Sequence, residues 1–92
     1  MTKISCLPRT MMQNKVTARK DKLIEQYRML CMNKAADGRE LSYNYAAAQR
    51  SFTKKDICIL TLLEKLLDSV PSDFYIDDDD AIDAFVRLTK EG

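Results

Sequence analysis

The most reactive side chains in this sequence belong to three widely separated cysteines, Cys6, Cys31 and Cys58. Their number is odd and no Cys-x-x-Cys pair occurs, so the pattern indicates neither a disulfide framework nor a structural zinc site. Cys31 and Cys58 stand among Met, Leu and Ile, where a free cysteine behaves as a small hydrophobic residue. We therefore expect reduced thiols packed in the core of a cytoplasmic protein, with reactive thiols as the alternative.

Other catalytic chemistry lacks its usual groups. The chain has no histidine, which is the commonest general base and transition-metal ligand. With only two glycines it contains no phosphate-binding loop, no dinucleotide-binding pattern and no Gly-x-Ser-x-Gly elbow. We expect a protein that is not an enzyme and that needs no metal and no cofactor.

A run of four acids, at Asp77, Asp78, Asp79 and Asp80, precedes an apolar helical pattern. The run lacks the glycine and the distal glutamate of a calcium-binding EF-hand loop, and consecutive acids on a helix point in different directions. Acids at a helix N-terminus complement the helix dipole. We expect that structural role first, and contact with a basic partner surface as the alternative.

Charge is segregated along the chain. Residues 1–50 carry ten Lys/Arg and four Asp/Glu (net +6), whereas residues 51–92 carry five and ten (net −5). The two halves either attract each other within the fold or present opposite fields to partners. A basic face attracts phosphate without reading sequence. The candidate phosphate contacts are Lys15, Arg19, Lys20, Lys22 and Arg28.

Scarce glycine and proline, together with many Leu, Ala and Met residues, predict an all-α fold. The chain is long enough for one small domain. We predict an irregular tail over 1–10 and a single helical domain over 11–92, a bundle of about four helices near 12–34, 41–51, 54–69 and 78–90. Gly38 is the expected end signal after the first helix, and Thr53-Lys54-Lys55-Asp56 resembles a capping box that begins the third.

The third predicted helix is apolar around most of its circumference and is expected to be central in the bundle. One face carries Ile57, Leu60, Leu63, Leu67 and Val70, and another carries Cys58, Ile59, Leu62 and Leu66. Either the other helices enclose both faces, or the second face stays open as a binding or self-association surface. The second helix has its own expected stripe of Leu41, Tyr45, Ala48 and Phe52.

These patterns predict a small, non-enzymatic regulatory or inhibitory protein that binds a larger protein partner, with homo-oligomer formation as a further expectation. The candidate partner-binding residues are Ile59, Leu62, Leu66 and the acids Asp77, Asp78, Asp79 and Asp80. The alternative is a nucleic-acid-associated transcription regulator that uses the basic N-terminal half. Membrane association is not expected, because the longest nearly apolar stretch, 57–67, is short and is interrupted by polar residues.

Overall fold

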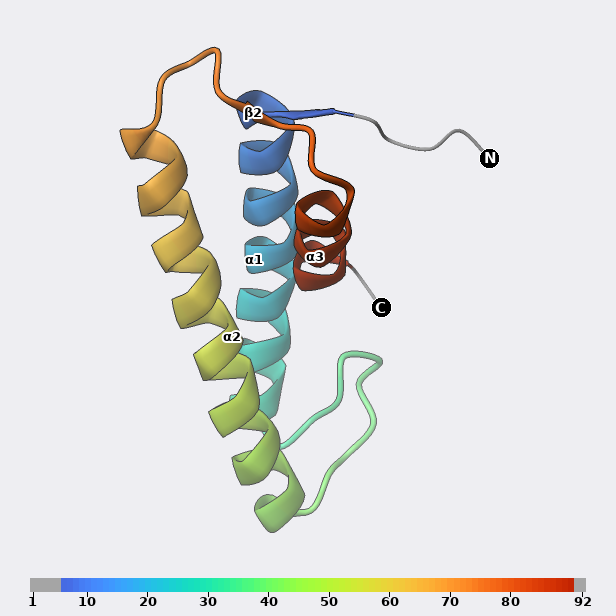
Figure 1. The fold of residues 1–92 in the computed structure, drawn as a ribbon. Helices are drawn as coiled ribbons and strands as arrows, with labels where there is room; N and C mark the ends of the chain where they lie inside the picture. The colour runs from blue at the N-terminus through green and yellow to red at the C-terminus, as the bar shows by residue number, and fades with distance from the viewer. Residues whose placement is uncertain (1–5, 91–92) are drawn as a thin grey trace.

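The computed structural model describes residues 6–90, which form three helices and a two-stranded antiparallel sheet. The elements follow in the order β1 (Leu7–Pro8), α1 (Arg9–Cys31), α2 (Tyr43–Ser69), β2 (Tyr75–Ile76) and α3 (Asp79–Thr89). Helices α1 and α2 run side by side as an antiparallel hairpin, and the short α3 lies against the opposite side of α1 in Figure 1. The all-α prediction is confirmed, apart from the small sheet, but the four-helix bundle is wrong.

The second and third predicted helices are one continuous helix, α2, of 27 residues. No glycine or proline lies between Tyr43 and Ser69, so nothing in the backbone forces a break. Thr53 was predicted to begin a helix as a cap, but it lies in the middle of α2 and is buried. The cap of α2 is Ser42, whose hydroxyl accepts a hydrogen bond from the Tyr45 N–H at 3.3 Å.

The packing of the hairpin follows a spacing of seven residues. In α2 the buried side chains are Ala46, Thr53, Leu60 and Leu67, and in α1 three of the four buried side chains are Val16, Leu23 and Leu30. A repeat of seven keeps one side of each helix facing the other along their shared length. Because α2 is so long, the rest of this small chain cannot surround it. The predicted central position belongs instead to α1, which packs against β1, α2 and α3.

The C-terminus of α1 has a Schellman motif at Asn33, several residues before the predicted stop at Gly38. Asn33 adopts a left-handed conformation with φ 57°, its N–H donates to the Leu30 carbonyl, and the Lys34 N–H donates to the Met29 carbonyl, each at 3.0 Å. Gly38, at φ 90°, instead serves the tight connection between the helices, where its N–H donates to the Ala35 carbonyl.

Arg50 of α2 also satisfies this helix end. Its guanidinium donates to the Leu30 carbonyl at 2.8 Å and to the Asn33 side-chain oxygen at 3.4 Å, and it lies 5.8 Å from the centre of the Tyr43 ring. A cationic donor is suited to the negative end of a helix dipole. Arg50 therefore links the two helices beside their connection.

We expect Arg50→Ala to lower the free energy of unfolding by about 1–3 kcal/mol, because two partly buried acceptors lose a charged donor. Urea denaturation measures the change. Arg39→Ala is the matched control, since the exposed side chain of Arg39 pairs with Asp37 of the same loop and does not reach the helix end. Equal losses in the two variants would contradict a role for Arg50 in holding the helix end.

The first and last thirds of the chain are joined by the two-stranded sheet. Leu7 pairs with Ile76 and Pro8 with Tyr75, and the Arg9 N–H donates to the Phe74 carbonyl at 2.8 Å. The expected irregular tail therefore ends earlier than residue 10, since Leu7 and Pro8 are a strand and α1 begins at Arg9. The segment 1–5 of that expected tail lies outside the described residues. Leu7 is fully buried, in the same core cluster as Met12, Leu60 and Phe85.

Helix α3 closely matches the prediction. Its cap is Asp78, whose carboxylate accepts a hydrogen bond from the Ala81 N–H at 2.8 Å. Asp79 and Asp80 occupy its first turn and Arg87 its last, as the helix dipole favours. Ile82 and Phe85 insert into the core cluster. Within residues 6–90, no helix is both long enough and apolar enough to cross a membrane.

Candidate protein-binding surface

The most distinctive surface of the molecule is a row of large apolar side chains along the outside of α2, which we call the outer stripe. It consists of Tyr45, Phe52, Ile59, Leu62 and Leu66, each between 45 and 60 per cent exposed. Four of them are spaced seven residues apart, and Leu62 falls three after Ile59. Positions seven apart on a helix differ by only about 20° in direction, so the stripe stays on one side of α2.

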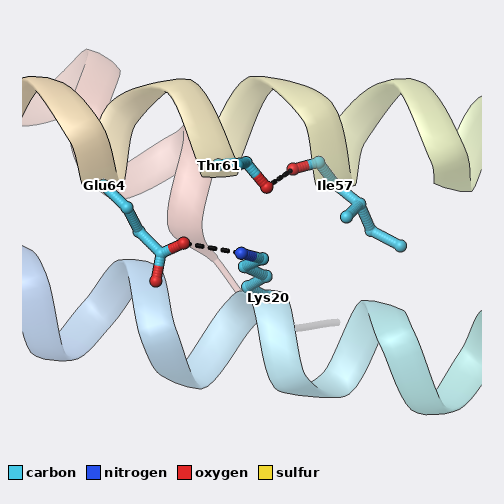
Figure 2. Close-up of polar contacts among 4 residues, drawn as sticks. All are labelled: Lys20, Ile57, Thr61 and Glu64. Carbon is cyan, nitrogen blue, oxygen red and sulfur yellow. Dashed lines mark hydrogen bonds and ion pairs between the residues drawn. The ribbon is translucent and has the colours of Figure 1, made fainter.

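A neighbouring side of α2, about 100° around the helix from the row that runs from Tyr45 to Leu66, faces α1. Figure 2 shows Ile57, Thr61 and Glu64 directed toward α1, where Glu64 accepts from the Lys20 ammonium at 2.6 Å and the Thr61 hydroxyl donates to the Ile57 carbonyl at 2.8 Å. These side chains are partly buried. Leu60 and Leu67 complete this inner side in the core. The core contact of α2 with α1 is therefore made by other side chains, and the outer stripe is not part of the hydrophobic core.

Two faces of this helix were distinguished from the sequence, and the structure separates them in the same way. Ile57, Leu60, Leu63, Leu67 and Val70 are buried or half-buried, whereas Cys58, Ile59, Leu62 and Leu66 are exposed. The alternative, in which other helices enclose both faces, is wrong. The binding role assigned to Ile59, Leu62 and Leu66 stays a prediction, and their accessibility is the finding.

Sequence reasoning did not include Tyr45 and Phe52 in this surface. They were placed on the stripe of a separate second helix, together with Leu41 and Ala48. Because α2 continues through Thr53 without a break, Tyr45 and Phe52 become collinear with Ile59, Leu62 and Leu66. Leu41 lies before the start of α2 and is not part of this surface. The missing signal was available in the spacing of seven from Tyr45 to Leu66, which crosses the expected boundary between the helices.

The four acids lie elsewhere. Asp77, Asp78, Asp79 and Asp80 are exposed at the N-terminus of α3 and are not continuous with the outer stripe, because α3 lies across α1 from it (Figure 1). Asp78 is committed to capping α3. The structure therefore does not combine the predicted partner-binding residues into one site. Among residues 6–90, no group of three Cys, Asp or Glu side chains is arranged to hold a metal ion.

The five candidate phosphate contacts also do not form one free basic face. Lys20 is paired with Glu64 between the helices, and Arg28 is paired with Glu25 at 3.0 Å on α1 itself. Lys22 is engaged within the protein as well. Lys15 and Arg19 are half-buried. Arg19 also lines a cavity of about 220 Å³, together with Asp56 of α2 and with Arg87 and Lys90 near the C-terminus.

The cysteines correct another expectation. Cys31 and Cys58 were predicted to pack in the core, but both are exposed, as is Cys6, and none is in a disulfide. Cys31 is the last residue of α1, and Cys58 points away from the core beside the outer stripe. Their apolar neighbours in sequence misled the prediction, because in a helix adjacent residues point in different directions.

No protein-family model matches this chain, and neither the curated proteins nor the solved structures gave a significant match. Its function is therefore inferred from the geometry and chemistry of its own surface.

Proposed function

We propose that this chain is a small, non-enzymatic regulatory protein that binds a larger protein through the outer stripe of α2. The observation that carries the proposal is the continuity of five large, exposed apolar side chains along one helix, from Tyr45 to Leu66. At about 100 Å² each, they present on the order of 500 Å² of surface. Patches of this size on monomeric proteins are often functional, and a stable interface buries about 800 Å² per partner.

The chemistry of the stripe favours a helical or otherwise apolar protein surface as its target. Aromatic residues near one end and branched aliphatic residues near the other provide anchors at every second helical turn, with Leu62 between the last two. Regularly spaced anchors on one face are the pattern of a helix that pairs with another helix or enters a groove. Tyr45 adds a hydroxyl at the edge of the patch. Three exposed, free thiols support a reducing location, and we propose the cytoplasm.

Nucleic-acid binding through the basic half is the weaker proposal, because Lys20 and Arg28 are already neutralised by carboxylates. A phosphate-binding protein loses affinity steeply as salt rises, whereas apolar docking is far less sensitive. Retention of a partner at high salt therefore supports docking through the outer stripe. Complete loss of retention at high salt, together with a gel shift of duplex DNA at low salt, supports binding through the basic half.

Capture from cell extract with matched variants tests the proposal. We expect the wild-type chain to retain a stoichiometric protein, Ile59→Gln and Leu62→Gln to reduce its retention at least tenfold, and Lys54→Gln to retain it fully. Lys54 is the control because it is exposed on α2 outside the stripe. Circular dichroism should show the same helix content for all four proteins. A partner retained equally by all four would refute docking through the stripe.

A further inference from the structure

We infer that the outer stripe of α2 pairs in antiparallel fashion with the outer stripe of a second copy of this chain. This inference goes beyond the proposed function, because it gives the same surface an alternative occupant, a second copy of this chain, with which a larger partner would compete. Two rows run along the outside of α2 at a spacing of seven residues. One row is Tyr45, Phe52, Ile59 and Leu66, and the other, three residues further on, is Ala48, Lys55, Leu62 and Ser69. Paired rows at this spacing form the seam of a two-stranded coiled coil.

Side-chain size decides the direction of pairing. In an antiparallel pair each residue of the first row lies opposite one of the second row. The opposing pairs are Tyr45 with Ser69, Phe52 with Leu62, Ile59 with Lys55, and Leu66 with Ala48. Large side chains then lie opposite small ones at both ends, which fills space evenly along the seam. A parallel pair would instead place Ala48 against Ala48 and Ser69 against Ser69, and would leave gaps there.

The charge of Lys55 also favours the antiparallel direction of pairing. A parallel pair would bring Lys55 against Lys55 of the second copy in the middle of an apolar seam, and two like charges taken out of water oppose association. The antiparallel pair places each Lys55 against Ile59 instead, where the lysine stem packs and its ammonium reaches solvent. Lys55 is exposed in the isolated chain. A single lysine in a seam selects register and orientation at a cost in stability.

The symmetry and area of this arrangement suit a dimer. An antiparallel pair of identical helices in this register has a two-fold axis at the level of Ile57, so every contact occurs twice and the assembly closes at two copies. The seam uses nearly all of α2, a helix about 40 Å long. The five stripe residues of each copy supply on the order of 500 Å². Lys55 of the second row and the flanking Cys58 and Lys65 bring the total close to the roughly 800 Å² per partner of a standard interface.

Analytical ultracentrifugation from about 2 µM to about 200 µM tests the pairing, since dimer formation follows mass action. We expect the wild-type mass to rise from that of a monomer to that of a dimer. Leu62→Glu should remain monomeric throughout, Lys54→Glu should dimerise like the wild type, and Lys55→Leu should dimerise at least tenfold more tightly. A wild-type chain that stays monomeric, or equal effects of Leu62→Glu and Lys54→Glu, would overturn the inference.

Pulsed EPR distances determine the direction. With the native cysteines replaced by serine, a spin label at Ser69→Cys should report a separation of about 36 Å in the antiparallel dimer, against roughly 15 Å or less if the helices were parallel. A short distance overturns the antiparallel assignment. A monomeric protein that still retains a stripe-dependent partner would refute self-pairing and leave the proposed function standing. A stable dimer that retains no such partner would support self-pairing and refute the proposed function.

Discussion

Replacing Leu60 by alanine is expected to lower the free energy of unfolding by about 2–5 kcal/mol, whereas the same replacement at Leu62 should change it by less than about 0.5 kcal/mol. The two leucines are two positions apart on α2, but Leu60 is 1 per cent exposed and Leu62 is 59 per cent exposed. Truncation of Leu60 leaves a cavity between α1, α2 and α3, while truncation of Leu62 removes atoms that are mostly in water.

Urea denaturation at a protein concentration near 1 µM, below the range in which self-association is expected, measures both changes. The pair is internally matched, because residue type, helix and substitution are the same. Comparable losses at the two positions would mean that the outside of α2 is packed against something within the monomer, and the outer stripe would then be part of the core. At higher concentration the wild-type chain and Leu60→Ala, which both keep the outer stripe, should gain apparent stability, whereas Leu62→Ala should not.

Leu7→Ala is expected to cost a similar amount, about 2–5 kcal/mol, which is enough to unfold most molecules of a marginally stable small domain. Leu7 is fully buried although it lies near the start of the chain, and it pairs with Ile76 in the sheet. Its side chain contributes to the same cluster as residues of all three helices. Thermal or urea unfolding followed by circular dichroism measures the loss.

Cys6→Ala is the control for Leu7→Ala, since Cys6 is the adjacent residue and is exposed. It should change the free energy of unfolding by less than about 0.5 kcal/mol. If Leu7→Ala proved as mild as Cys6→Ala, the two-stranded sheet would unfold separately from the helices, and the core would not include the N-terminal strand.

Helix type was predictable wherever periodicity was strong, and helix ends were predictable only where the sequence signals agreed. For α3 the acids, the apolar face and the terminal cations all agreed, and its observed start at Asp79 lies one residue from the prediction. At Thr53 the capping pattern competed with a helix that had no breaker, and burial of Thr53 against α1 decided for continuity. Asn33 ended α1 before Gly38 because asparagine also tolerates the left-handed conformation.

The candidate site was also predictable in part, because helical periodicity places some of its residues on one face. Ile59, Leu62 and Leu66 share a face by spacing alone, and that face is open in the structure. Tyr45 and Phe52 joined it only because the helix continues, which the spacing of seven residues indicated and the capping pattern at Thr53 obscured. The sheet could not have been foreseen, since the segment around Leu7 is short and contains Pro8, and its partner Ile76 is near the other end of the chain.

That pairing of Leu7 with Ile76 has a consequence for the order of folding. The α1–α2 hairpin closes a short connection, so its contacts can form early, whereas the strands at positions 7 and 76 must be brought together across almost the whole chain. We therefore expect the ladder to form in the final step, after the transition state. Interactions made at that stage change the rate of folding little and mainly slow unfolding. We therefore expect this small sheet to stabilise the helical hairpin chiefly by slowing its unfolding.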